Sequence, residues 1–168
     1  YPDAIIDVIG PAWSVPILAR MVDVRKAITL PTSHGEWGIS TRKNLGKSLR
    51  HENYDEAIVL PRSWKSALVP FFAKIPKRVG FHGEQRFVLL NERRTLDKTC
   101  LNQTVKRFTS LGLTKKRAYP PLPKDMLNPK LEVDLNNQVR LYQSLALNPT
   151  KPAICLMAGA EFGPSKQW

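Results

Sequence analysis

Residues 55–81 read DEAIVLPRSWKSALVPFFAKIPKRVGF, and this stretch decides the fold class. The run from Asp55 to Leu60 is short and apolar, which is typical of a buried strand. From Ser63 onward, large apolar residues recur at helical spacing, at positions 64, 68, 71, 72 and 75. The run from Arg78 to Phe81 predicts a second strand. Strand, helix and strand joined by short connections form a βαβ unit, which implies a parallel sheet.

The same alternation extends on both sides of this unit. Upstream, we expect strands over 4–10 and 24–30 and helices over 13–21 and 39–52; downstream, helices over 101–111 and 139–145 and a strand over 152–157. Pro70 should kink the helix that begins near Ser63. The chain as a whole predicts an α/β fold, with a Rossmann-like parallel sheet and flanking helices.

A proline-rich stretch, Ala118-Tyr-Pro-Pro-Leu-Pro123, interrupts the alternation. Three prolines in four residues exclude a helix and favour an extended connector. We therefore expect an incomplete N-terminal domain over 1–117, a linker over 118–135 and the start of a second domain over 136–168. Both ends are expected to be cut, because the first strand has no upstream partner and the last glycine-containing turn leads into no helix.

Positive charge is concentrated in one region of the chain. Residues 62–117 hold 14 lysines and arginines against three acidic residues, a net +11 out of +12 for the whole chain. This clustering predicts a polyanionic partner, which could be nucleic acid, an anionic membrane surface or a phosphorylated substrate. The longest apolar run, Ala67 to Ala73, has seven residues and is far too short to span a bilayer.

The first candidate binding segment runs from Leu60 to Ser66. Arg62 and Lys65 fall at the end of a strand and in the first turn of a helix, where ligands of parallel α/β sheets bind. Cations there oppose the helix dipole, so an anion held between them and the helix amides would explain them. The alternative is a solvated surface pair, with Ser63 acting only as the helix cap.

The second candidate segment is Gly80-Phe-His-Gly-Glu-Gln-Arg86, which is followed by Arg93 and Arg94. Guanidinium groups suit phosphate and carboxylate because they bind both in bidentate fashion. A solvated basic face is the alternative.

The third candidate segment is Gly159-Ala-Glu-Phe-Gly163 together with Lys166. Amides at the start of an expected helix, with a lysine beside them, would stabilise a diphosphate as it departs. The segment is neither a P-loop nor a dinucleotide fingerprint, and a structural turn is equally compatible with it. No metal site is expected from the histidine spacing, and Cys100 and Cys155 are expected to be free, buried thiols.

Taken together, these segments resemble one family, the lipopolysaccharide heptosyltransferases of glycosyltransferase family 9. The resemblance covers nearly the whole chain and is weakest from Leu113 to Leu147. It is carried by Tyr1–Val8, Ala57–Ala73, Ile75–Arg86, Leu89–Asn91 and Gly159–Lys166.

The resemblance implies a GT-B fold, with the active site between two Rossmann-like domains. It implies an inverting transfer of L-glycero-D-manno-heptose from ADP-heptose to the first heptose of the lipopolysaccharide inner core, carried on Kdo2-lipid A. The reaction would take place in the cytoplasm of a Gram-negative bacterium, with the enzyme peripheral at the inner face of the inner membrane. No cofactor is implied beyond the nucleotide-sugar donor, and no specific nucleic acid is expected as a partner.

Three alternatives remain open at the level of sequence. One is the step of a type I heptosyltransferase, in which heptose is transferred directly to Kdo2-lipid A. Another is a relative that has lost activity and serves as a scaffold. The third is a basic nucleic-acid-binding module. It is disfavoured because Trp64, Phe71, Phe72 and Phe108 fall on apolar helix faces, where they would pack as core and leave no platform for stacked bases.

Site residues follow from matched positions. Arg62, Ser63 and Lys65 match the acceptor-side loop of the family, and Arg86, Arg93 and Arg94 join them as acceptor-binding candidates from their charge. The donor-binding residues would be Gly159, Ala160, Glu161, Phe162, Gly163 and Lys166, with Lys166 stabilising the leaving group. Ala158 and Gln167 depart from the proline and arginine usual in the family. The family's catalytic aspartate would lie upstream of Tyr1, so we expect this chain alone to be inactive.

Overall fold

The structure is a computed structural model that describes residues 3–32, 36–113, 130–152 and 154. The chain divides into two compact units, Tyr1–Leu131 and Glu132–Trp168. Their boundary falls inside the range 118–135, whose role as a linker stays a prediction. The strand expected over 152–157 and the donor segment lie outside the described residues, apart from Pro152 and Ile154.

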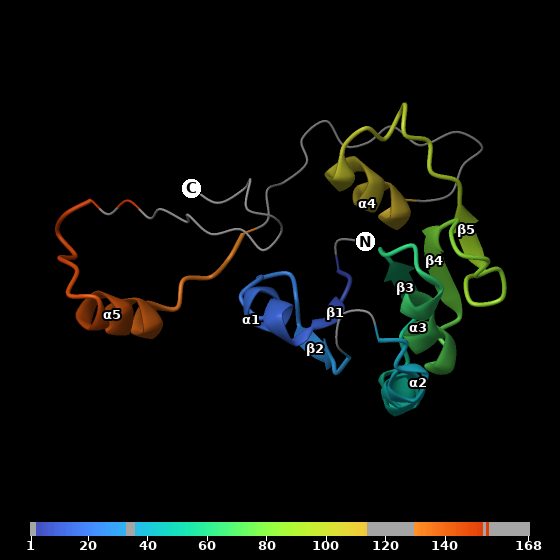
Figure 1. Cartoon of the computed structure of the whole chain (residues 1–168), viewed down its shortest axis with the longest axis horizontal. Helices are drawn as coiled ribbons and strands as arrows, with labels where there is room; N and C mark the ends of the chain where they lie inside the picture. The colour runs from blue at the N-terminus through green and yellow to red at the C-terminus, as the bar shows by residue number, and fades with distance from the viewer. Residues whose placement is uncertain (1–2, 33–35, 114–129, 153, 155–168) are drawn as a thin grey trace. The chain divides into compact units, whose positions relative to one another are not determined.

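Strands and helices alternate along the first unit, except that β5 follows β4 with no helix between them (Figure 1). Its elements are β1 (Asp7–Pro11), η1 (Ala12–Ser14), α1 (Val15–Leu18), β2 (Lys26–Leu30), α2 (Ile39–Ser48), η2 (Leu49–Glu52), β3 (Glu56–Val59), η3 (Trp64–Ala67), α3 (Leu68–Phe72), β4 (Lys77–Phe81), β5 (Glu92–Arg94) and α4 (Thr104–Gly112), where η marks a 3-10 helix.

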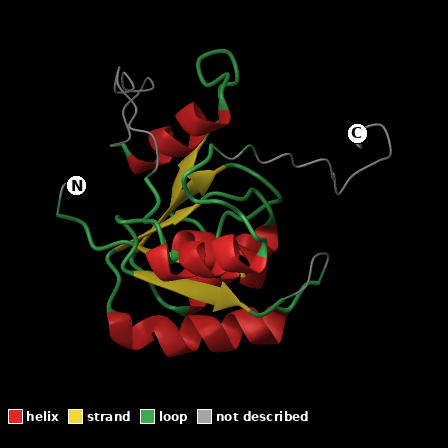
Figure 2. Ribbon diagram, turned by 90° about the vertical axis from the view of Figure 1, so that its left-hand side faces the viewer, coloured by secondary structure: helices red, strands yellow, loops and turns green. Residues whose placement is uncertain are grey.

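All the named strand pairs are parallel, as the sequence predicts. β1 pairs with β2, and β3, β4 and β5 follow one another in a second, three-stranded sheet. Helices flank the strands of this unit (Figure 2). The expected Rossmann-like α/β architecture is therefore confirmed. Because the strands of a parallel sheet point the same way, the loops after β3 and β4 leave from one edge.

One part of the core lies between the strands and the packed pair α2 and α3, and another joins Val79 and Phe81 of β4 to Leu111 of α4. One buried cluster joins Ile28 of β2 to Val69 of α3 and to Ala73, which directly follows α3. Gly46 allows this packing, because a Cβ there would lie 2.6 Å from the carbonyl oxygen of Val69 and 2.7 Å from Cβ of Phe72. The two helices thus approach each other more closely than any larger residue at position 46 would permit.

A charged cluster links the amino ends of the strands. The side chain of Asp7 at the start of β1 is only 3% exposed and accepts hydrogen bonds from Nε of Arg25 (2.8 Å) and from the hydroxyl of Tyr54 (2.5 Å). Arg25 and Lys26 also pair with Glu52. The cluster lies at the amino ends of these strands, so we treat it as a structural clamp.

Three expectations need correction. The helix predicted from Ser63 is divided into η3 and α3, and Pro70 sits in the first turn of α3, where it removes no helical hydrogen bond, so it does not act as a mid-helix kink. The helix expected over 13–21 shortens to η1 and α1. Cys100 is free but exposed, because Leu101 takes the neighbouring buried position. The other cysteine, Cys155, lies outside the described residues.

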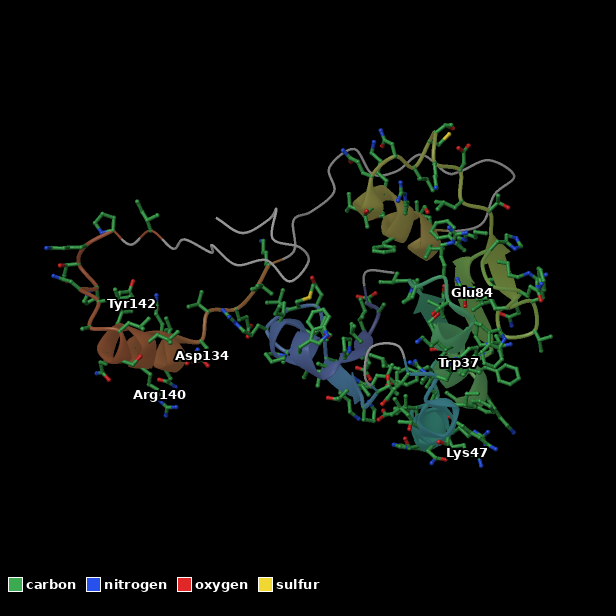
Figure 3. All side chains as sticks on the ribbon, viewed as in Figure 1. Trp37, Lys47, Glu84, Asp134, Arg140 and Tyr142 are labelled. Carbon is green, nitrogen blue, oxygen red and sulfur yellow. The ribbon has the colours of Figure 1, made fainter. Side chains whose placement is uncertain are left out.

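The second unit contributes one described helix, α5 (Leu135–Ser144). Asp134 caps it by accepting a hydrogen bond from the amide of Asn137 at 2.9 Å. The helix begins four residues before the expected range because of this cap. Asp134, Arg140 and Tyr142 mark it in Figure 3.

Candidate functional site

Three loops meet at the carboxyl ends of the strands in the first unit. The loop after β3, residues 60–66, is here called the acceptor loop, after the role that the sequence predicts for it. Arg62 donates from Nε to the carbonyl of His82 at 3.1 Å, which joins the acceptor loop to the loop after β4. Lys65 donates from Nζ to the carbonyl of Glu36 at 3.0 Å, which joins it to the loop after β2. These two hydrogen bonds link the loops after β2 and β4 to the acceptor loop.

Close backbone contact tightens the first of these junctions. A Cβ at Gly83 would lie 2.5 Å from the carbonyl oxygen of Arg62, so only glycine lets the two loops touch. Gly80, within β4, serves a similar purpose, since a Cβ there would lie 2.9 Å from Cδ1 of Leu90. The glycines of the Gly80–Arg86 segment thus serve close packing.

Arg86 supports the acceptor loop from beneath. Its side chain is 1% exposed and donates to the carbonyls of Pro61 (2.6 Å), Ser63 (3.2 Å) and Phe81 (2.7 Å) and to Oγ of Ser66 (3.1 Å). Burial lowers the pKa of Arg86, and the neighbouring Arg62 charge acts in the same direction. Because the guanidinium is enclosed, Arg86 shapes the loop and does not present its charge to a ligand.

Arg93 and Arg94 are also engaged within the fold. Arg94, 7% exposed, donates to the carbonyls of Ser110 and Leu113 and so satisfies the carboxyl end of α4. Arg93 donates to the carbonyl of Phe87 at 2.6 Å, and its guanidinium lies 5.5 Å from the centroid of that ring. We leave both, with Arg86, out of the proposed acceptor contacts.

Glu84 is a residue of the site that the sequence pattern does not single out. Its Oε2 accepts a hydrogen bond from the amide of Trp64 at 2.6 Å, at the start of η3 (Figure 3). Ser63 occupies the cap position but makes no side-chain capping bond. The amide expected to receive an anion is therefore already paired with a carboxylate. The only signal in the sequence is that Glu84 is the single acid in the segment Gly80–Arg86.

The cations of the acceptor loop that reach solvent are Arg62 and, to a lesser extent, Lys65; Arg93, beyond the loop after β4, is partly buried like Lys65. Arg62 is exposed and Lys65 is partly buried. Each uses one hydrogen bond to hold a neighbouring loop, which leaves further donors on both head groups for an anionic ligand. Within the described residues, no group of three His, Cys, Asp or Glu side chains is placed to hold a metal ion. No helix in the described ranges is long and apolar enough to cross a membrane.

Comparison with known proteins identifies the family. The family described as glycosyltransferase family 9 (heptosyltransferase) matches residues 42–168. This chain belongs to glycosyltransferase family 9. Both the acceptor loop and the segment Gly159–Gly163 fall inside the matched range. Trp64, Phe71 and Phe72 pack against a buried cluster and are partly buried, as expected for core aromatics, whereas Phe108 is exposed, contrary to the expectation.

Relatives of this family 9 chain are heptosyltransferases. It is 46% identical over 170 residues to lipopolysaccharide heptosyltransferase 2 of Salmonella typhimurium and of Escherichia coli. It is 45% identical over 172 residues to lipooligosaccharide heptosyltransferase 2 of Haemophilus influenzae. In each case the match covers 100% of this chain and 49% of the relative, so the chain spans about half the length of these proteins.

A solved structure matches the fold of the family 9 chain over its whole length. The structure of E. coli ADP-heptose lipopolysaccharide heptosyltransferase II superposes with a TM-score of 0.83 at 43% identity, covering 100% of this chain and 49% of that one. The expectation of a Rossmann-like architecture of the GT-B type is therefore confirmed. The donor residues Gly159 to Gly163 and Lys166 lie outside the described residues, so their role stays a prediction.

Proposed function

We propose that the protein containing this chain transfers L-glycero-D-manno-heptose from ADP-heptose to the first heptose of the lipopolysaccharide inner core, with inversion at the anomeric carbon. The observation that supports it most is the match to E. coli heptosyltransferase II, at a TM-score of 0.83 and 43% identity over the full chain. The relatives named above carry heptosyltransferase 2 in their names, which favours the second heptose step.

The described residues take the acceptor side of this reaction. A hydroxyl of the acceptor heptose attacks the anomeric carbon of the donor, loses its proton to a base, and ADP departs with the bonding electron pair. Arg62, Ser63 and Lys65 would hold the acceptor through its phosphates and sugar-acid carboxylates. Charge-assisted hydrogen bonds of this kind hold an anionic substrate in place and take no part in the bonds that form and break.

The donor side rests on the sequence. Amides of Gly159, Ala160, Glu161, Phe162 and Gly163, with the Lys166 ammonium, would face the diphosphate. A positive charge there stabilises the negative charge that develops on the leaving group in the transition state. Lys166 is therefore proposed to act on the rate of transfer more than on acceptor affinity.

The proposal is tested with the full-length protein and ADP-heptose on two acceptors, Kdo2-lipid A with and without the first heptose. We expect transfer to the heptosylated acceptor and little to the bare one. Transfer to bare Kdo2-lipid A alone would show a type I step. Absence of transfer to either acceptor, from a protein that is folded by circular dichroism, would overturn the proposal in favour of a relative without activity.

The place of the reaction is proposed from the acceptor. A glycolipid anchored in the inner membrane presents its sugars at the cytoplasmic surface, so the enzyme would bind there peripherally. Exposed cations such as Arg62 suit an anionic surface, and such binding weakens as salt screens it. Sedimentation with vesicles containing anionic lipid, at low and high salt, measures this, and binding that is insensitive to salt would contradict it.

A further inference from the structure

Trp37 is an exposed aromatic side chain at the edge of the candidate site. It lies in the loop between β2 and α2, and 65% of its surface is exposed (Figure 3). The other tryptophan near the acceptor loop, Trp64, packs against the buried cluster below it. An indole left in solvent contributes little to the core.

Arg42 of α2 holds the backbone around Trp37 from one side. The guanidinium of Arg42 donates from Nε to the carbonyl of Trp37 at 3.0 Å and from Nη2 to Oγ1 of Thr32 at 3.2 Å. Arg42 is only 6% exposed, and burial lowers its pKa, so a cation has been taken out of water to fix this loop. Gly38 turns the chain with φ of +51°, directly after the indole.

The backbone is held on the site side as well. Nζ of Lys65 donates to the carbonyl of Glu36 at 3.0 Å, one residue before Trp37. The same lysine belongs to the acceptor loop, so the backbone next to Trp37 is tied to the place where the acceptor is proposed to bind. Backbone carbonyls held by hydrogen bonds at Glu36 and Trp37, next to an exposed side chain, suit a preorganised binding surface.

The ligand chemistry follows from the ring and its neighbours. The face of an indole is electronegative and apolar, and it attracts the polarised C–H groups on the flat side of a pyranose ring. Lys65, which bonds to the carbonyl of the adjacent Glu36, supplies further donors for hydroxyl, phosphate or carboxylate groups of the same ligand. We propose that Trp37 stacks against a pyranose ring of the acceptor glycolipid; this inference rests on the proposed function.

The test compares Trp37→Ala and Trp37→Phe with the wild-type full-length protein on a deacylated acceptor, which keeps the sugars and lacks the lipid. We expect Trp37→Ala to raise the KM for this acceptor about threefold to tenfold with kcat within twofold. Trp37→Phe should recover most of the affinity. Equilibrium binding of the same oligosaccharide without donor should show the same order, and the melting temperature should not change.

Trp13→Ala is the matched control. Trp13 is 77% exposed, and within the described residues no hydrogen bond joins η1 to the acceptor loop. The acceptor KM of Trp13→Ala should therefore match that of the wild type. An unchanged KM in Trp37→Ala overturns the inference while transfer by the wild type leaves the proposed function standing. A defect that appears only with the lipid-bearing acceptor assigns Trp37 to the bilayer and also overturns it. A wild type that neither transfers to nor binds the oligosaccharide overturns both.

Discussion

At the scale of single residues, Arg62 and Arg86 share one group of loops and meet opposite surroundings. Arg86 is enclosed and bonds to three carbonyls, whereas Arg62 is exposed. Arg86→Met would leave the carbonyls of Pro61 and Phe81 without their partner, at a cost of about 2 kcal/mol or more. We expect a lower free energy of unfolding in urea, together with a raised acceptor KM as the loop relaxes.

The matched control at this scale is Arg62→Met. Stability should fall by about 1 kcal/mol or less, because the side chain is exposed and loses one hydrogen bond, to the carbonyl of His82. The acceptor KM should rise roughly tenfold, which is the loss expected for one charge-assisted hydrogen bond. If the two substitutions lowered stability equally, the division between supporting and contacting arginine would be wrong.

A different result is expected for Lys166, because the negative charge that it would stabilise develops on the leaving group as the reaction proceeds. Lys166→Ala in the full-length protein should lower kcat, by roughly a hundredfold, more than it weakens acceptor binding. Steady-state kinetics with both substrates varied would separate the two effects. A kcat equal to that of the parent protein would remove Lys166 from the leaving-group role.

At the scale of elements, α2 and α3 pack through Gly46. In Gly46→Ala the new methyl group would meet the backbone oxygen of Val69, which cannot move aside as a side chain can. Overpacking costs about 1–3 kcal/mol and exceeds the gain of about 1 kcal/mol in helix propensity. Thermal unfolding should therefore show a less stable protein.

Gly112→Ala in α4 is the matched control for this pair of helices. A Cβ there would lie 3.8 Å from Cδ1 of Ile58, an ordinary contact, so the propensity gain should prevail. We expect this variant to be as stable as the wild type or up to about 1 kcal/mol more stable. Destabilisation of both variants alike would show that helix contact at Gly46 is not the cause.

The clamp around Asp7 makes the stability of the fold depend on pH. The hydrogen bond from Arg25 lowers the pKa of Asp7 most, with help from Tyr54. A lowered carboxyl pKa adds stability that is present above the unfolded value of about 4 and lost as pH falls through the folded value. Asp7→Asn should be about 1–3 kcal/mol less stable at pH 7 and should lose less stability below pH 4.

In the alkaline range the same clamp affects stability in the opposite direction, because stability is lost as pH rises. Burial, followed by the hydrogen bond to Asp7, raises the pKa of Tyr54 to about 12. The stability it contributes is present below the unfolded value of about 10 and lost between about pH 10 and 12, so Tyr54→Phe should flatten that decline. Urea unfolding across pH measures both limbs. Asp23→Asn, which is exposed and outside the cluster, should follow the wild-type curve.

The strength of the sequence signal explains which elements could be predicted. Apolar runs mark β3 and β4, and helical spacing marks the segment from Trp64, because burial and periodicity are encoded locally. β5 has no such signal, because Glu92, Arg93 and Arg94 carry charge where a strand usually carries apolar residues. The same charge suggests ligand contacts at Arg86, Arg93 and Arg94. Arg86 and Arg94 also bond to carbonyls of distant segments, the acceptor loop and the end of α4, so only the fold reveals that they are engaged.

For the whole molecule, the excess of positive charge predicts how acceptor binding responds to salt. The chain carries a net +12, and Arg62 and Lys65 sit where an anionic acceptor is proposed to bind. Raising the ionic strength from about 0.05 M to about 0.5 M shortens the screening length from about 14 Å to about 4 Å. The acceptor KM of the full-length protein should rise at least about threefold, because exposed charge pairs are the ones that salt weakens.

A double variant separates the site from the general charge of the molecule. Arg62→Met with Lys65→Met removes two cations at the site and leaves the others in place. Its acceptor KM should start higher and rise less steeply with salt than that of the wild type. If both proteins showed the same slope, the attraction would come from the overall charge, and the acceptor loop would have no special role in capturing the glycolipid.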